Sequence, residues 1–345
     1  MSVRDEILEQ PAALQRLLDA APGAFAPISA AVRSRRPRFV VMAARGSSDN
    51  AGIYAQYLLA VRNGLIVALA APSTITLYGA RPDMADALVV GISQSGRSPD
   101  IVGVVEEARR QGALTVALTN DGASPLAGTA DHVIDLHAGP ERATAATKTY
   151  TGELLAAALL STALDPPEPA ETAALGALPH LVSAALAVEP QARDLAARHA
   201  TRQRAVVLGR GYSYPSAREW ALKLQEMALV AAMAYSAADF EHGPLALAEP
   251  GLPVLAVACS GSELEAQVAL LTRLKADHGA RLLVISDAAA ARTIDEGLAL
   301  PGGVPPWLAP IVEIVPAQLY AYHLTVARGL DPEHPRSIHK VTETR

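Results

Sequence analysis

The sequence has only one cysteine, Cys259, among its 345 residues. A disulfide within the chain is therefore excluded, and so is a zinc site built from four cysteines. A chain so poor in cysteine suits a reducing compartment, and we expect it in the cytoplasm. The apolar residues that precede Cys259 predict a buried and inert thiol instead of a nucleophile.

The chain also lacks an excess of basic residues, since 29 lysines and arginines stand against 35 acidic residues, with a net charge of −6 at pH 7. Proteins that bind duplex nucleic acid usually show a strong basic excess, so we expect no nucleic-acid partner. No uninterrupted apolar run reaches the ~18 residues typical of a membrane span. The first residues, MSVRDEILEQ, contain no apolar signal-peptide core. We therefore expect no membrane association.

What the sequence does contain is an internal repeat. The segment FVVMAARGSS at 39–48 resembles AVVLGRGYS at 205–213, so that Arg45 and Arg210 are 165 residues apart (210 − 45). The segments ALVVGISQSGRSPD and PVLAVACSGSELE repeat at the same offset, which joins Ser95 to Ser260 (260 − 95). A strand, a glycine turn, a helix and another strand form a βαβ unit, and such units build parallel sheets.

The repeat predicts an α/β fold class with two copies of one domain, each a parallel sheet flanked by helices. A Pro- and Glu-rich stretch, DPPEPAET, is typical of a linker between them. The expected divisions are a helical segment at 1–34, the first copy at 35–165, a linker and helix at 166–199, the second copy at 200–330 and a polar tail at 331–345.

The turn GISQSGRSPD suits a phosphate or another oxyanion. An apolar strand delivers hydroxyl groups, an amide and backbone N–H groups to the start of a helix, whose dipole is positive there. The turn has no lysine, which excludes a nucleotide-binding loop of the P-loop type. A serine-rich helix cap is the alternative explanation. The candidate ligands, including the similar turn at 45–50, are Ser47, Ser48, Ser93, Gln94, Ser95 and Ser98.

A second candidate region is the helix that follows Tyr214. Glu219, Lys223 and Glu226 share one face of it, and the sequence alone favours a solvated row of ion pairs. Another face suits packing in the core and comprises Trp220, Leu224, Met227 and Ala231. Tyr214 stands where a dinucleotide-binding turn needs its third glycine, so a dinucleotide cofactor is not expected. His242 has no second metal ligand at a suitable spacing, so we expect no metal.

Several ordered motifs together resemble a known family, the sugar isomerase (SIS) domains. They are ISQSGRSPD, ATKTYT at 146–151, LGRGYSYPSAREWALKLQE, FEHGPLAL and QLYAYHLTVARGLDPEHPRSIHK. The arrangement is similar to the isomerase half of glucosamine-6-phosphate synthase, which implies two tandem SIS domains with flavodoxin-like, three-layer folds.

The resemblance implies roles for individual residues. Glu226 matches the carboxylate that moves a proton between C1 and C2 of the sugar, and Lys223 matches the lysine beside it. His242 matches the ring-opening histidine, which in the family comes from the neighbouring subunit and so implies a homodimer. Lys340 matches the lysine that forms an imine with the ketose. The remaining matches are the phosphate turn, with Ser47, Ser93, Gln94, Ser95 and Ser98, and the sugar loop, with Glu141 and Thr144.

Two departures from the family pattern affect the expected function. Ala146 replaces a serine that touches the sugar, and the chain begins directly before the first copy, without a glutaminase domain. The resemblance then implies the deaminase direction: glucosamine 6-phosphate and water give fructose 6-phosphate and ammonia, with no cofactor. The alternatives are an aldose–ketose isomerase, a deaminase for another amino-sugar or ketosamine phosphate such as galactosamine 6-phosphate, and a regulator that binds a sugar phosphate without turnover.

Overall fold

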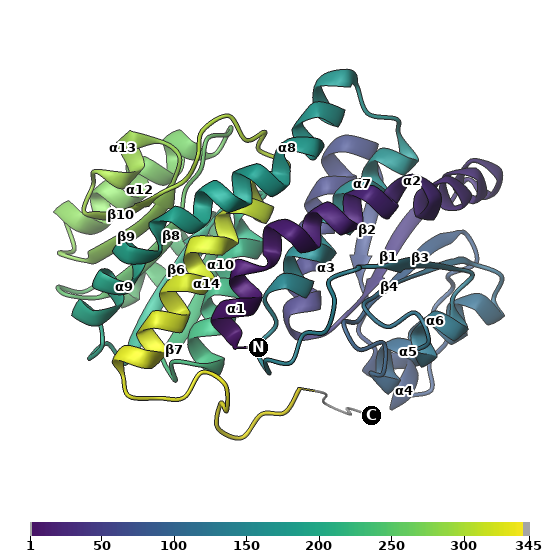
Figure 1. The fold of residues 1–345 in the computed structure, drawn as a ribbon, viewed down its shortest axis with the longest axis horizontal. Helices are drawn as coiled ribbons and strands as arrows, with labels where there is room; N and C mark the ends of the chain where they lie inside the picture. The colour runs from purple at the N-terminus through teal and green to yellow at the C-terminus, as the bar shows by residue number, and fades with distance from the viewer. Residues whose placement is uncertain (1, 341–345) are drawn as a thin grey trace. The chain divides into compact units, whose positions relative to one another are not determined.

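The computed structural model describes residues 2–340. The chain forms two compact units, which Figure 1 shows in colours that run from purple at the N-terminus to yellow at the C-terminus. The first unit contains residues 12–141, 148–176 and 339–340. The second unit contains residues 2–11, 142–147 and 177–338.

The first unit is built on a five-stranded parallel sheet with the strand order β2-β1-β3-β4-β5. Every residue of β3 is buried, as expected for a central strand that is covered on both faces. The strands are β1 (Phe39–Ala43), β2 (Ile66–Leu69), β3 (Ala87–Ile92), β4 (Leu114–Thr119) and β5 (His132–Asp135). The helices are α2 (Gln10–Arg35), α3 (Gly46–Asn63), α4 (Ser73–Thr76), α5 (Pro99–Arg110), α6 (Pro125–Thr129) and α7 (Lys148–Leu164).

Helices cover both faces of this sheet. The apolar residues of α5 and α6 pack in one cluster with Val41, Val89 and Ala117 of the sheet. Gly52 of α3 lies against Met42, whose side chain points to the other face because side chains alternate along a strand. α5 has Ser98 at its N-cap and a proline at its first position, and it ends in two arginines that suit the negative end of the helix dipole.

The second unit repeats the architecture. Its sheet has the order β10-β9-β8-β6-β7, the same sequence of neighbours as in the first sheet, and its paired strands are parallel. The strands are β6 (Arg204–Gly209), β7 (Ala231–Ser236), β8 (Pro253–Val257), β9 (Arg281–Ser286) and β10 (Glu296–Ala299). The helices are α1 (Val3–Leu8), α9 (Glu189–Arg198), α10 (Ser213–Glu226), α11 (Ala237–Glu241), α12 (Leu264–Ala276), α13 (Ala289–Arg292) and α14 (Ala309–Ala327), with short 3-10 turns at Leu186–Val188 and Pro244–Leu247. α8 (Pro169–Ala185) begins in the first unit and ends in the second.

The core of the second unit has an aromatic centre. The buried rings of Trp220 on α10 and Tyr320 on α14 meet edge to face, with centroids 5.7 Å apart. His199 at the end of α9 lies beside Tyr320, and its Nδ1 is 2.9 Å from the Tyr320 hydroxyl. The other face of the sheet packs against α11 and α12, with Phe240 fully buried. The two sheets confirm the predicted α/β fold with a duplicated domain.

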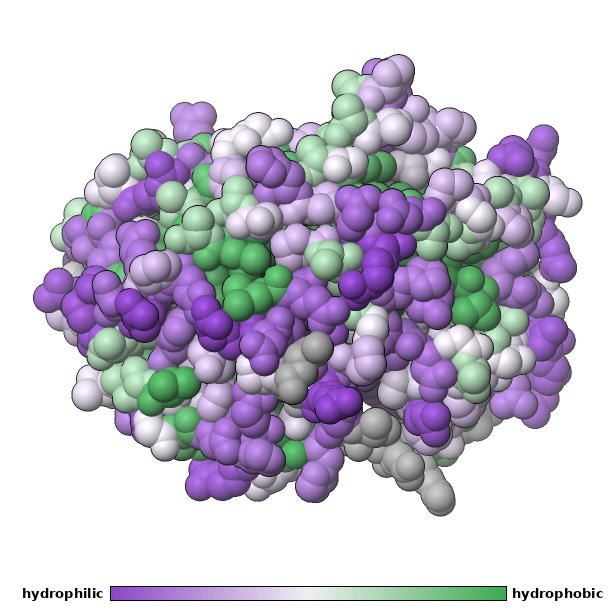
Figure 2. Space-filling model, in the orientation of Figure 1, coloured by the Kyte–Doolittle hydropathy of each residue, from purple (hydrophilic) through white to green (hydrophobic). Residues whose placement is uncertain are grey.

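One helical stretch among the described residues, Pro169–Arg198, is long and apolar enough to cross a membrane by length and composition. This stretch was not expected from the sequence. A single stretch of this kind is weak evidence for a span, and it comprises α8, a 3-10 turn and α9. Its Glu189 accepts a hydrogen bond from Arg4 at 2.6 Å and lies 3.0 Å from His323. Figure 2 shows hydrophilic residues over most of the visible face, with hydrophobic residues in small, separate areas.

Candidate active site

The predicted phosphate turn lies at the carboxyl edge of the first sheet, where the strand order changes direction. β1 has neighbours on both sides, and the chain visits β2 on one side before it continues with β3 on the other. In open parallel sheets of this order, ligands bind at this switch point between β1 and β3. The turn after β1 (residues 45–48) and the turn after β3 (residues 93–98) therefore form one candidate anion-binding site, the anion seat.

In the turn after β3, the serine at the start of the helix does not use its hydroxyl to cap the helix. Ser98 is the N-cap residue of α5, but its hydroxyl makes no capping hydrogen bond. Its Oγ instead lies 3.5 Å from the Oγ of Ser93. Gly96 has φ +61°, and a Cβ at this position would lie 2.0 Å from the Oγ of Ser124. The close contact with Ser124 and the positive φ both require glycine here, which fixes the path of the turn.

The turn after β1 is open above its glycine. Gly46 has φ +57°, and a Cβ built on it would meet nothing within 4 Å. Ser47 is half-buried at the start of α3. Ser48 is buried, and its hydroxyl donates to Glu153 of α7 at 2.8 Å. Ser47 is thus the more exposed of the two serines.

Arg45 connects the two turns. Its Nε donates to Asp100, the second residue of α5, at 2.8 Å. Asp100 is buried, whereas about half of the Arg45 side chain is exposed. The guanidinium group therefore adds a positive charge at the edge where two helices begin, and both helix dipoles have the same sign there.

Glu141 and Lys340 meet in the first unit. The Nζ of Lys340 donates to Oε2 of Glu141 at 2.6 Å, and Glu141 is buried. Thr149 holds the same carboxylate with its backbone N–H at 3.1 Å and its hydroxyl at 2.7 Å. The tail lysine is therefore docked on a carboxylate whose orientation is fixed from α7.

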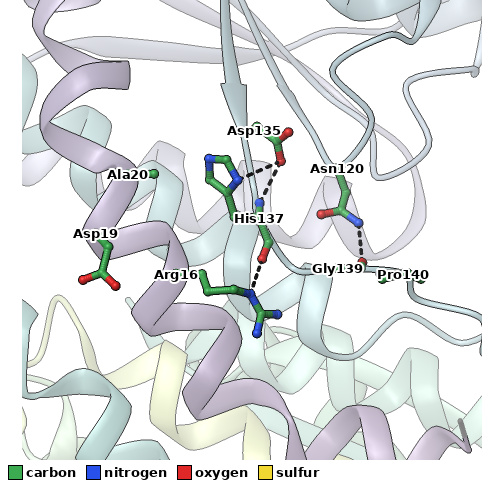
Figure 3. Close-up of a pocket in the computed structure, with 8 residues that line it drawn as sticks. All are labelled: Arg16, Asp19, Ala20, Asn120, Asp135, His137, Gly139 and Pro140. Carbon is green, nitrogen blue, oxygen red and sulfur yellow. Dashed lines mark hydrogen bonds and ion pairs between the residues drawn. The ribbon is translucent and has the colours of Figure 1, made fainter.

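A surface pocket of about 870 Å³ lies next to the phosphate turn in the same unit. Figure 3 shows Arg16 directed toward the backbone of His137, with its Nε 2.8 Å from the carbonyl oxygen. Asn120 links this pocket to the turn, because its N–H donates to the carbonyl of Gln94 at 3.1 Å and its side chain donates to the carbonyl of Gly139 at 2.8 Å. The lining residues are Arg16, Asp19, Ala20, Asn120, Asp135, His137, Gly139 and Pro140, none of which was a predicted site residue.

The second unit contains the acidic row on α10. Lys223 is fully buried, and its Nζ lies 2.5 Å from Glu226 and 3.3 Å from Glu219. Burial alone would lower the pKa of Lys223, but the two carboxylates raise it above its ordinary value. Glu219 is also fully buried, whereas 23% of the Glu226 side chain is exposed. The expectation of a solvated row was therefore wrong: Glu226 alone reaches the solvent.

The other predicted residues of the second unit are separate in sequence from this row. His242 is exposed at the end of α11, and its N–H donates to the carbonyl of Asp239 at 3.0 Å. Thr144 is half-buried in the segment 142–147. The buried carboxylate of Glu6 holds this segment by accepting the N–H of Arg142 at 2.6 Å. Thr144 and Glu141 thus belong to different units although they are close in sequence.

The comparison with known proteins identifies the family. Residues 35–163 and 200–328 both match the model of the SIS domain. The chain belongs to the SIS-domain family. It is 34% identical over 343 residues to glutamine–fructose-6-phosphate aminotransferase (isomerizing) of Pyrococcus horikoshii, a match that covers 97% of this chain and 56% of the relative. The chain therefore spans little more than half the length of that relative.

Solved structures agree with this assignment. A protein of Silicibacter pomeroyi, described as a proposed phosphosugar isomerase, is 38% identical, with a TM-score of 0.88 over 96% of this chain and all of that chain. The C-terminal domain of glucosamine-fructose-6-phosphate aminotransferase of Francisella tularensis is 26% identical, with a TM-score of 0.86 over 96% of this chain and 98% of that chain. The resemblance drawn from the sequence motifs is confirmed.

The second SIS domain carries a turn equivalent to the phosphate turn, and Cys259 lies in it. Burial raises the pKa of the Cys259 thiol well above its usual value, and the nearby Glu313 adds to the effect. The prediction that the thiol is buried is therefore confirmed, and its inertness stays a prediction. Ala231 is exposed, contrary to the expectation that it packs in the core, because α10 ends at Glu226 and Ala231 begins β7.

Some residues of the first SIS domain that support the candidate site were not singled out from the sequence. Glu153 and Thr149 are far in sequence from the turns and loops that they hold, and Asp100 was one more acid at a helix start. Arg45 served only to define the repeat, although its occurrence in both copies, directly before the glycine of the turn, was a pattern that could have indicated a role at the sheet edge.

Proposed function

We propose that the chain converts glucosamine 6-phosphate and water into fructose 6-phosphate and ammonia. The observation that carries this proposal is the pair of Lys223 and Glu226, in which a buried ammonium holds a partly exposed carboxylate at 2.5 Å. A carboxylate held in this way is pre-positioned for proton transfer to a bound sugar. The names of the relatives, which concern fructose 6-phosphate and its aminated product, support the choice of substrate.

The phosphate group of the substrate is assigned to the seat at the ends of β1 and β3. Ser47, Ser93, Gln94, Ser95 and Ser98 supply hydroxyl, amide and backbone donors there. The dipoles of α3 and α5 favour a dianion at this edge. Anchoring the phosphate orients the reacting end of the sugar, and orientation contributes to the rate by replacing a random encounter with a fixed geometry.

The chemistry proceeds in three steps. His242 transfers protons during opening of the sugar ring, since an imidazole can both accept and donate a proton. Glu226 then removes the proton from C2 and returns it to C1, so that the amino aldehyde becomes a 2-imine. Water adds to the imine carbon, the C–N bond breaks, and ammonia leaves as the ketone forms. Lys223 stabilises the negative charge that develops on the sugar oxygen. We propose that His242 acts on the substrate of a partner subunit in a homodimer.

The tail lysine has the least direct role in this scheme. Lys340 donates a hydrogen bond to Glu141, and the hydroxyl of Thr149 donates to the same carboxylate. We propose, as the alternative to direct attack by water, that Lys340 leaves Glu141 and displaces ammonia from the imine carbon. Water then hydrolyses the resulting lysine imine to the ketone, and the freed Lys340 returns to Glu141. Replacement of Lys340 by methionine should then slow turnover more than it weakens phosphate binding.

The proposal is tested by following ammonia and fructose 6-phosphate together, with glucosamine 6-phosphate as substrate. Equal amounts of both products are expected. Glu226→Gln should lower kcat by about 100- to 10,000-fold, the usual contribution of a general acid–base group. Glu265→Gln, which changes an exposed carboxylate on α12, is the matched control and should leave kcat unchanged.

Three outcomes would contradict the proposal in whole or in part. Unchanged turnover in Glu226→Gln would remove the carboxylate from the mechanism. Ketose formation from an aldose 6-phosphate, without ammonia from any amino-sugar phosphate, would assign the chain to aldose–ketose isomerisation. Ammonia from galactosamine 6-phosphate alone would change the substrate and keep the reaction.

A further inference from the structure

The two SIS domains differ in what lies above their first glycine turn. Gly46 and Gly211 are equivalent at the offset of 165 residues, and their φ angles are +57° and +58°. A Cβ on Gly46 would meet nothing within 4 Å, whereas a Cβ on Gly211 would lie 2.0 Å from Oε1 of Glu263. A Cβ on Gly261, the glycine of the second turn, would lie 2.8 Å from Oε2 of the same carboxylate. The space that is open in the first domain is filled in the second.

The side chain that fills this space is negatively charged, as a phosphate ligand would be. Glu263 stands at the position of Ser98, again at the offset of 165 residues (263 − 98). The first domain therefore has a hydroxyl donor where the second has a carboxylate. α10, a helix of 14 residues, begins at Ser213, two residues after Gly211, so its dipole is positive where the carboxylate lies. An anion at that end of a helix is favourable, and here the chain itself supplies the anion.

The donors of the second turn are engaged as well. The N–H of Ser260 donates to Oδ1 of Asp287 at 2.8 Å. The hydroxyls of Ser213 and Ser216 donate to the buried carboxylate of Glu313, at 2.7 Å and 2.9 Å. Ser213 is equivalent to Ser48, which likewise donates to a buried carboxylate, so the donor that is taken only in the second turn is the N–H of Ser260. The negative charges of Asp287 and Glu263 disfavour a dianion at this edge.

We propose that Glu263 closes the anion seat of the second SIS domain and thereby determines that each chain takes one sugar phosphate, in its first domain. Glu263 is then a specificity-determining residue, since it decides which of two duplicated turns accepts the phosphate. The assignment of the seat in the first domain rests on the proposed function, but the closure of the second seat does not.

The test exchanges the residues at the equivalent positions and counts bound phosphate. Equilibrium dialysis with radiolabelled inorganic phosphate gives the number of ions per chain. Glu263→Ser is expected to bind one more phosphate per chain than the parent protein, because the substitution removes the carboxylate and restores the serine of the first domain. Glu265→Gln, which removes an exposed carboxylate two residues further along, is the matched control and should leave the number unchanged.

The reciprocal variant checks the same geometry in the first domain. Ser98→Glu is expected to bind one phosphate fewer than the parent, and the double variant Ser98→Glu with Glu263→Ser should bind the same number as the parent. Thermal melting verifies that each variant is folded. An unchanged number of phosphates in folded Glu263→Ser would overturn the proposal, and so would a parent protein that already binds two phosphates per chain.

The number of phosphates bound per chain does not depend on whether the protein turns over its substrate. Glu263 is not part of the proposed catalytic machinery, so ammonia release by Glu263→Ser should stay within about twofold of the parent. A protein that releases no ammonia but gains one phosphate in Glu263→Ser would contradict the proposed function and support the closed seat. A protein that releases ammonia but gains none would do the opposite.

Discussion

The buried charge row on α10 allows the structural and catalytic roles of Lys223 to be separated. In Lys223→Met the ammonium is lost while Glu219 stays fully buried and Glu226 stays mostly buried. Removal of one partner from a buried ion pair typically costs about 3–5 kcal/mol, because the remaining charge has been taken out of water. We expect the free energy of unfolding of Lys223→Met to fall by about this amount.

A second variant restores the balance of charge. In Lys223→Met with Glu219→Leu, an apolar pair of similar volume replaces the buried ion pair, an exchange that is often neutral or stabilising. Glu226 can be hydrated through its exposed part. The double variant should therefore unfold within about 1 kcal/mol of the parent, while both variants lack deaminase activity because the oxyanion has lost its ammonium.

Urea denaturation followed by tryptophan fluorescence is a suitable assay. The chain has two tryptophans, Trp220 and Trp307, and both lie in the second unit together with the charge row. Circular dichroism at the same urea concentrations reports on the whole chain. If the free energy of unfolding of Lys223→Met stays within about 1 kcal/mol of the parent, the lysine does not balance the buried carboxylates and the reasoning is refuted.

Further predictions concern the phosphate turn and the aromatic centre. Gly96→Ala should abolish phosphate binding in dialysis, because φ is positive there and the new Cβ would lie 2.0 Å from Ser124. The control is Gly112→Ala, which has φ +83° and open space around it; it should lose only about 1–2 kcal/mol of stability and still bind phosphate. Normal phosphate binding by Gly96→Ala would contradict the turn geometry. Burial, followed by the charge of Arg202, lowers the pKa of His199 from 6.5 to about 4. The unfolded chain then binds the proton more tightly, so stability should fall as the pH drops from about 6.5 toward 4, by on the order of 1–2 kcal/mol after allowance for solvent screening. Urea midpoints at pH 7.5 and pH 5 should show this decrease in the parent and a smaller one in His199→Gln; equal decreases would assign the effect to other groups.

Local patterns in the sequence were sufficient to predict the fold class and to place the serine-rich turn, proposed here to bind phosphate, between a strand and a helix. Apolar runs that end in Arg-Gly or Ser-Gly recur at one offset, and each run became a buried strand followed by a helix. These features depend on residues that are neighbours in the chain, such as the proline at the first position of α5.

The burial of the charge row could not be predicted in the same way. Helical periodicity correctly placed Glu219, Lys223 and Glu226 on one face, but it contains no information on what covers that face. In the structure the side chains of Glu219 and Lys223 are inaccessible to solvent, so the ion pairs are internal.

Contacts between residues that are distant in the chain could not be predicted from the sequence either. The carboxylate of Glu153 that accepts from Ser48 is 105 residues away, and Glu141 lies 199 residues before Lys340. The fold brings these groups together through the packing of α7 and the path of the tail. No spacing rule connects residues that are separated by several strands and helices.

The path of the chain has a consequence for any attempt to produce one domain alone. The backbone passes from one unit to the other after residues 11, 141, 147, 176 and 338. A fragment that begins near residue 200 would lose Glu6 and also the segment 142–147, whose backbone N–H groups donate to the Glu6 carboxylate. A fragment that ends near residue 165 would lose the tail with Lys340. Each unit is therefore assembled from segments that are separate in the sequence, and gene fragments cut at the family boundaries should yield incomplete, aggregation-prone products in expression trials.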